Sequence, residues 1–143
     1  MAILLIQIGL GILGLLGVMH GLYTLKDFRK PFYFAPRDRE LVTVLETAGM
    51  GITDQQNNFW RAYLGFHLSH SLGILVFVVT FFGLTFINPA LIFHPFLSAI
   101  LIGTGVLYAI LSRVFWFSKP FIGVSLATLL FVAGLAVHMI GGT

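Results

Sequence analysis

The sequence predicts an all-α membrane protein, a four-transmembrane-helix bundle with one short amphipathic surface helix. Hydrophobic residues make up 58% of the chain and charged residues only 9%, whereas a soluble domain carries about 25% charged residues. Four apolar stretches each supply roughly the 20 residues that a helix needs to cross about 30 Å of hydrocarbon. The period-two alternation of a membrane β-barrel is absent. We therefore expect residues 1–143 to form a single transmembrane domain.

The four predicted spans are, in chain order, about 2–24, 60–87, 96–117 and 121–140. The first span is interrupted only by Gln7 and His20. It lacks the basic start and the small-residue cleavage site of a signal peptide, so we expect it to remain as an uncleaved membrane helix.

A polar segment, residues 25–59, separates the first two spans. Within it, RDRELVTVLET (37–47) places Leu41, Val44 and Leu45 on one helical face, which predicts a short amphipathic helix on the membrane surface.

Proline and capping residues mark the other boundaries. Thr53 to Gln56 fits a capping box before the second span. Asn88-Pro89 predicts a turn, and Pro95 a kink or restart. Ser118-Lys119-Pro120 predicts a very short link between the third and fourth spans. Proline is tolerated in a first helical turn, so the fourth span can begin at this point.

Charge placement predicts the orientation. The charged residues all border one side of the predicted bundle, and the opposite side carries no charged side chain. The positive-inside rule makes the charged side cytoplasmic. We therefore expect a multi-pass protein of the inner membrane with segment 25–59 in the cytoplasm and both termini outside.

Polar residues gather at similar predicted depths in the cytoplasmic half of the spans. Counting helical turns from the boundary places His20, His67 and His70 about one, two and three turns inside, at ~1.5 Å per residue. Residues at i, i+3 and i+4 share a helical face. The other predicted members of this layer are Tyr63, Ser71, Tyr108, Ser112, Ser125 and Thr128.

This histidine-rich layer has two interpretations. It can be structural, with imidazoles and hydroxyls joining helices through hydrogen bonds worth about 0.6 kcal/mol each. It can instead bind a ligand, since intramembrane ionisable residues mark functional sites. The cofactor-binding candidates are His20, His67, His70 and Tyr108, and the three histidines are the metal-ligand candidates. Haem, a chlorophyll-type pigment or a quinone are the possible cofactors.

Several functions are disfavoured. The chain has no cysteine, which excludes disulfides, zinc–thiolate sites, iron–sulfur clusters and thiol nucleophiles. Because no acidic residue falls within a predicted span, a di-iron enzyme, a carboxylate proton relay and a serine hydrolase are all disfavoured. The basic residues follow membrane topology, so the net charge of +3 does not indicate nucleic-acid binding.

The segment KDFRKPFYFAPRDR interleaves basic and aromatic residues, a pattern that indicates contact with anionic lipid head groups. An ordinary positive-inside loop has the same composition, so both interpretations stay open. The predicted lipid-contact residues are Lys26, Arg29, Lys30, Arg37, Arg39 and Arg61.

The stretch NNFWRAYLGFHLSHSLG, residues 57–73, resembles the signature of an uncharacterised family of small four-helix bacterial integral membrane proteins. In that signature a tryptophan and a Gly-Phe precede Ser-His-Ser-Leu-Gly at the start of the second span. The resemblance implies the four-helix fold and a bacterial origin, and it transfers no activity.

These observations favour a non-enzymatic membrane component with no catalytic residues, an accessory or assembly subunit of a larger membrane complex. Membrane lipids and either partner membrane proteins or a second copy are the expected partners. Small residues such as the Gly17–Gly21 and Gly65–Gly73 pairs would let other helices approach closely. The alternative is a redox protein that binds a cofactor or quinone through its histidines.

The orientation can be tested by labelling single cysteines in intact cells, since the natural chain has none. Asn88→Cys and Gly142→Cys are expected to react with an impermeant thiol reagent applied outside, because both positions lie on the side without charges. Thr43→Cys is expected to stay unlabelled until the cells are opened. Labelling of Thr43→Cys alone in intact cells would reverse the orientation.

Overall fold

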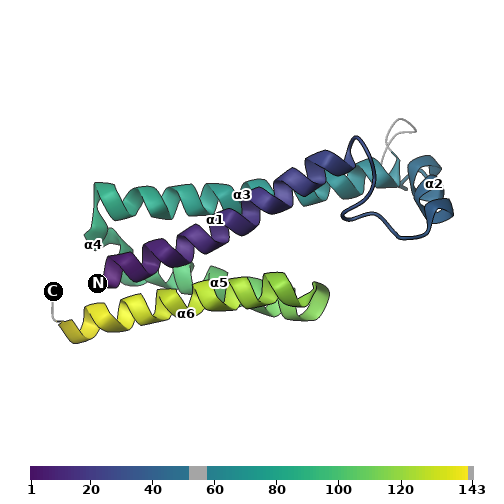
Figure 1. Ribbon diagram of the computed structural model, residues 1–143. Helices are drawn as coiled ribbons and strands as arrows, with labels where there is room; N and C mark the ends of the chain where they lie inside the picture. The colour runs from purple at the N-terminus through teal and green to yellow at the C-terminus, as the bar shows by residue number, and fades with distance from the viewer. Residues whose placement is uncertain (52–57, 142–143) are drawn as a thin grey trace. The chain divides into compact units, whose positions relative to one another are not determined.

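The computed structural model of the protein describes residues 1–51 and 58–141 and is all-α in these ranges (Figure 1). Four of its helices are long and apolar enough to cross a membrane, which confirms the predicted fold class. Outside the helices, Gly49 and Asn58 form an isolated β-bridge. The helices are α1 (Ala2–Asp27), α2 (Arg39–Thr47), α3 (Phe59–Ile87), α4 (Pro89–Ile92), α5 (Pro95–Phe115) and α6 (Ser118–Gly141).

The chain divides into two compact units, and each is described by itself. The first unit comprises residues 1–16 and 74–143, and the second unit comprises residues 17–73. Helices α1 and α3 contribute to both units. The first unit contains the apolar helical core, and the second contains the polar segment and the three histidines of the predicted layer.

Proline and capping residues set the helix boundaries much as the sequence predicts. His94 caps α5, with its Nδ1 accepting the Phe96 N–H at 3.3 Å, and Pro95 occupies the first turn. Pro89 similarly begins α4, a single short turn that the sequence did not predict. Helix α6 begins at Ser118 with Pro120 in its first turn, where the missing N–H has no intrahelical role.

Helix α2 begins two residues later than predicted because Asp38 is its N-cap, with a side-chain oxygen accepting the Glu40 N–H at 2.9 Å. Leu41 and Val44 of the predicted apolar face are 46% and 56% exposed, as a face directed at a membrane surface would be, while Val42 is buried inside the second unit. The capping box predicted at Thr53–Gln56 lies outside the described residues.

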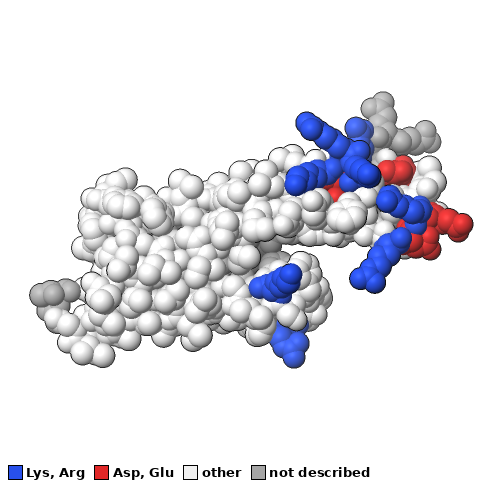
Figure 2. Space-filling model, in the orientation of Figure 1, with Lys and Arg blue, Asp and Glu red and all other residues white. Residues whose placement is uncertain are grey.

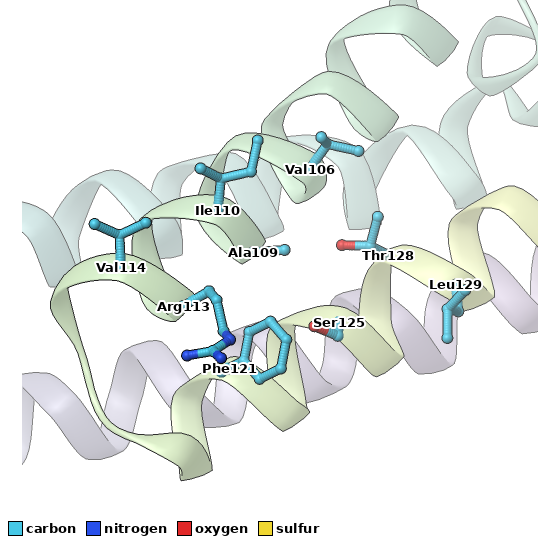
Figure 3. A pocket seen from close by; sticks show the side chains of 9 residues that line it. All are labelled: Val106, Ala109, Ile110, Arg113, Val114, Phe121, Ser125, Thr128 and Leu129. Atoms are coloured by element: carbon cyan, nitrogen blue, oxygen red, sulfur yellow. The ribbon is translucent and has the colours of Figure 1, made fainter.

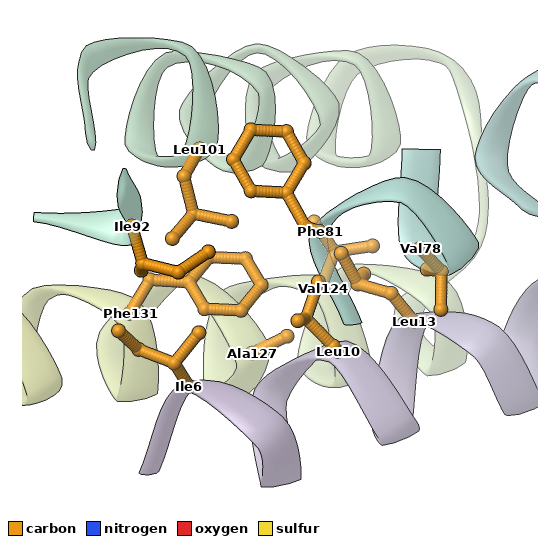
Figure 4. Close-up of a cluster of buried hydrophobic side chains, with 10 residues drawn as sticks. All are labelled: Ile6, Leu10, Leu13, Val78, Phe81, Ile92, Leu101, Val124, Ala127 and Phe131. Atoms are coloured by element: carbon orange, nitrogen blue, oxygen red, sulfur yellow. The ribbon is translucent and has the colours of Figure 1, made fainter. Parts of the chain in front are cut away.

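The core of the first unit is built from one face of each of its helices (Figure 4). Phe131 on α6 is fully buried and is among the largest of these side chains. The buried cluster is Ile6, Leu10 and Leu13 of α1, Val78 and Phe81 of α3, Ile92 of α4, Leu101 of α5, and Val124, Ala127 and Phe131 of α6.

Helices α1 and α6 approach each other closely at two glycines. A Cβ added at Gly9 would lie 2.7 Å from the Phe131 ring and 2.9 Å from the Ala127 carbonyl oxygen. A Cβ added at Gly134 would lie 2.7 Å from Ile6 and 2.9 Å from a backbone oxygen of α1. Small residues allow such approach between membrane helices, where dispersion contacts replace the hydrophobic effect.

One polar contact joins α1 to α3 in the first unit. The Gln7 amide Nε2 donates to the Thr85 hydroxyl at 3.0 Å, and this hydroxyl donates to the Phe82 carbonyl at 2.7 Å. Thr85 is only 4% exposed. The contact lies outside the polar layer that the sequence predicts. Gln7 and Thr85 are 78 positions apart in the sequence, a separation that gives no spacing to relate them.

The tight α1–α6 contact predicts a sharp difference between two glycines of the same helix. Gly9→Ala is expected to lower the free energy of unfolding by about 1–3 kcal/mol, because the methyl group meets a ring and a backbone oxygen. Gly11→Ala is the matched control, since an added Cβ there meets nothing within 4 Å. Unfolding in mixed micelles titrated with dodecyl sulfate measures both variants, and equal stabilities would contradict the packing.

Candidate functional site

The second unit brings together the three histidines of the predicted layer. His20 Nε2 of α1 and His67 Nδ1 of α3 lie 3.0 Å apart, a hydrogen-bond distance. Their rings are stacked, with centroids 5.0 Å apart and planes at 28°. His70, one turn further along α3, meets the His20 ring edge-on at 5.4 Å between centroids. We call these three residues the histidine cluster.

Aromatic side chains cover the histidine cluster. The Phe34 ring stacks on His67 at 4.6 Å between centroids and lies 4.7 Å from His20. Tyr63, one turn before His67, meets the His67 ring edge-on at 4.4 Å. The Tyr63 hydroxyl donates to the Phe34 carbonyl at 3.4 Å. The polar segment therefore folds back onto the membrane helices and places a phenyl ring over two imidazoles.

Asp27 holds this part of the segment in place. Its carboxylate is fully buried and accepts the backbone N–H groups of Phe32, Tyr33 and Phe34 at 3.1, 2.9 and 2.7 Å. A buried charge is tolerated only when it is hydrogen-bonded or paired, and three converging donors meet that requirement. The sequence predicts a first span that ends at about residue 24, whereas helix α1 continues to Asp27, whose side chain caps the returning backbone.

The contact between the two imidazoles leaves hydrogen-bonding capacity at both of its ends. A neutral imidazole has one N–H donor and one bare acceptor nitrogen. If His20 donates to His67, then His20 Nδ1 is an acceptor and His67 Nε2 carries a proton; the other tautomer reverses both roles. The contact between Nε2 of His20 and Nδ1 of His67 therefore always presents one donor and one acceptor outward.

Ser71 adds a further unused polar group to the second unit. It lies one position after His70 on α3, and its hydroxyl oxygen is buried without a hydrogen-bond partner among the described residues. The site of a Cβ added at Gly21 lies 3.4 Å from this oxygen. Gly21 thus lets α1 come close to α3, as expected for a small residue.

The arrangement does not fit a metal held between the two contacting histidines on opposite sides, as in a bis-histidine haem. Ligand nitrogens on opposite sides of a metal lie about 4 Å apart, because each metal–nitrogen bond is about 2.0 Å, whereas these nitrogens lie 3.0 Å apart. A haem or chlorophyll-type pigment also needs a flat slot beside its ligand, and Phe34 and Tyr63 cover the His67 ring. Among the described residues, no group of three His, Cys, Asp or Glu side chains is placed to hold a metal ion.

The hydroxyl residues predicted at the same depth on α5 and α6 belong to the first unit. Ser112 donates to Ala109 O at 2.9 Å, and Thr128 donates to Val124 O at 2.8 Å. These two hydroxyls therefore bond within their own helices, and the hydrogen-bond partner of His20 is His67. Tyr108 lies half-buried on α5 of the first unit, and its place among the cofactor-binding residues stays a prediction.

The six predicted lipid-contact residues all belong to the second unit and are all exposed. Lys26 Nζ lies 5.5 Å from the centre of the Tyr33 ring, and Arg39 Nη1 donates to Pro31 O at 3.5 Å. In this unit, the charged side chains gather around α2 and the segment that leads to it (Figure 2). This exposure leaves the six free to meet lipid head groups.

Sequence reasoning missed Phe34 and Asp27 as parts of the site. Their only visible signal is the concentration of aromatic residues in KPFYFAP, seven residues or fewer after an aspartate.

Comparison of the chain with protein-family models, with curated proteins and with solved structures finds no match.

The Asp27 contacts predict that this one carboxylate controls the cover over the histidine cluster. Asp27→Asn replaces one acceptor oxygen by an N–H₂ group that faces backbone donors, and a hydrogen bond to a charged group is worth about 1.5–3 kcal/mol. Amide hydrogen exchange at Phe32–Phe34 is expected to accelerate at least tenfold in lipid nanodiscs. Asp38→Asn is the control, since this exposed residue caps α2 and touches none of these amides. Unchanged protection in Asp27→Asn would show that the carboxylate does not hold the segment.

Proposed function

We propose that the protein is a non-enzymatic component of a bacterial inner membrane, an accessory or assembly subunit whose helices pack against those of a larger membrane complex. The observation that carries this proposal is a stripe of small residues, Gly65, Ser69 and Gly73, on the outer face of α3. We call it the α3 stripe.

Among the described residues, the two glycines of the α3 stripe face open space. A Cβ added at Gly65 or Gly73 would meet no atom within 4 Å. Ser69 is exposed, and its hydroxyl donates to the Phe66 carbonyl of its own helix at 2.8 Å. The surface is therefore smooth and has no unmet donor, which suits close approach by another helix backbone.

Other glycines of this chain lie against a neighbouring helix. Gly9 and Gly134 lie against side chains and backbone of a neighbouring helix, and Gly21 lies against Ser71. The small residues of the α3 stripe recur every four positions, and its two glycines face open space among the described residues. This arrangement supports contact with a helix of another protein. Large apolar side chains next to the stripe would enlarge such a contact, since Phe66, Leu72 and Val76 are 76%, 62% and 58% exposed.

The charge distribution supports the cytoplasmic placement of segment 25–59 and the outside placement of both termini. Each described acidic residue lies between Asp27 and Glu46, among the basic residues of the second unit. The remaining two basic residues, Arg113 and Lys119, flank the short α5–α6 connection, which the same rule places in the cytoplasm. The resemblance of residues 57–73 to a bacterial family supports the inner membrane.

A second candidate function is binding of a small molecule with a polar head, such as a quinone, at the histidine cluster. The donor and acceptor at the ends of the His20–His67 contact and the unpartnered Ser71 hydroxyl favour it. A quinone oxygen accepts hydrogen bonds and its reduced form donates them, so either tautomer of the histidines could serve it.

Purification of the tagged chain from its native membrane in polymer-bounded lipid particles tests the proposal. The wild-type protein is expected to retain partner membrane subunits. In the double variant Gly65→Leu/Gly73→Leu, the amount of copurified partner subunits is expected to fall at least tenfold, because the branched side chains hold a partner backbone away. The measurement is quantitative mass spectrometry of the copurified proteins, with the helical circular dichroism of each variant as a check of folding.

Gly11→Leu is the control, because this position is equally open but lies on α1. Retention of the same partners by the double variant would remove the α3 stripe as an interface, and recovery of the chain alone would overturn the accessory role. The same preparation is analysed for extracted quinone. His67→Gln is expected to release quinone while partners stay bound, and a wild-type sample without quinone would eliminate the second candidate.

A further inference from the structure

A groove of about 450 Å³ runs between α5 and α6 in the first unit (Figure 3). This volume lies within the range of about 300–1,000 Å³ that small-molecule sites occupy. Its walls are mainly aliphatic, and Val106, Ile110 and Leu129 are among the lining residues. Both helices are candidate membrane spans, so the groove opens toward lipid.

Arg113 supplies the only charge among the residues that line this groove. Its guanidinium carbon lies 5.9 Å from the centre of the Phe121 ring. The carboxylate side chains of the described residues all belong to the second unit, and none lies in the first unit with Arg113. The described part of the first unit therefore supplies no counter-charge to this cation.

The groove has one polar end and one apolar end. Arg113 lies near the end of α5, and Phe121 lies in the first turns of α6, so both are next to the α5–α6 connection. Val106 lies seven residues before Arg113, about 10 Å deeper along the helix. Ser125 lines the groove between the two ends. This gradient matches a molecule with an anionic head at the membrane surface and a hydrocarbon chain that extends inward.

We propose that this groove seats an anionic glycerophospholipid, with its phosphate on the Arg113 guanidinium and part of one acyl chain along the aliphatic wall. Basic pockets between membrane helices bind anionic lipid head groups in this way. Arginine suits the role because its planar fork binds phosphate through two parallel hydrogen bonds. The site is distinct from the six exposed basic residues that the sequence predicts to contact lipid, because those residues belong to the second unit.

The test places the full chain in nanodiscs of phosphatidylcholine with a minor fraction of phosphatidylglycerol. Native mass spectrometry then counts the phosphatidylglycerol molecules that the released protein retains. The wild type is expected to keep one with preference over phosphatidylcholine. Arg113→Gln is expected to lower this preference at least fivefold, since a basic side chain near the membrane surface contributes about that factor.

Two further variants separate the groove from general surface charge. Lys119→Gln removes an exposed charge from the same connection without touching the groove lining, and it is expected to keep the preference. Ser125→Phe keeps Arg113 but fills the groove, and it is expected to lose the retained lipid. Equal losses in Lys119→Gln and Arg113→Gln, or normal retention by Ser125→Phe, would overturn the proposal, and Ser125→Phe decides it if Arg113→Gln does not fold.

Discussion

Helices that meet in lipid gain little from burying apolar side chains, because lipid tails are as apolar as the helix surface. Close backbone contact and a small number of polar bonds must therefore hold them together. In the first unit, Gly9 and Gly134 provide the close contact between α1 and α6. The Gln7–Thr85 hydrogen bond joins α1 to α3. The buried apolar side chains of the first unit pack around these contacts.

The second unit meets the same constraint with ionisable groups. Its polar segment could not lie against membrane helices with free backbone donors, because each unpaired N–H in a dry environment carries a penalty. The buried carboxylate of Asp27 accepts three of these donors, and the donors in turn compensate its charge. These hydrogen bonds fix the backbone at Phe34 and so place its ring over His67. The aromatic cover therefore depends on one acidic residue at the end of α1.

The fold could be predicted from the sequence to a large extent, because span length, proline position and charge placement are local signals. Counting turns also predicted a similar depth for His20, His67 and His70, and the structure places the three in contact. The end of α1 was placed too early because the role of Asp27 depends on backbone that returns from five to seven residues later. Phe34 and the Gln7–Thr85 contact depend on the path of a loop and on helix rotation, which no periodicity encodes.

The histidine cluster offers more hydrogen-bonding capacity than a helix joint requires. Gln7 and Thr85 join α1 to α3 with an amide and a hydroxyl, so two imidazoles are not needed for that purpose. The imidazole contact can exchange its outward donor and acceptor when the shared proton crosses from His20 to His67 while His20 Nδ1 takes up a proton and His67 Nε2 releases one. On α3, His67 and Ser69 are two residues apart and so point about 200° from each other at 3.6 residues per turn, whereas His70 and Gly73 are three residues apart and point only about 60° from each other. A ligand at the His20–His67 contact and a partner helix on the α3 stripe would therefore occupy largely different surfaces, with His70 and Gly73 at their common edge.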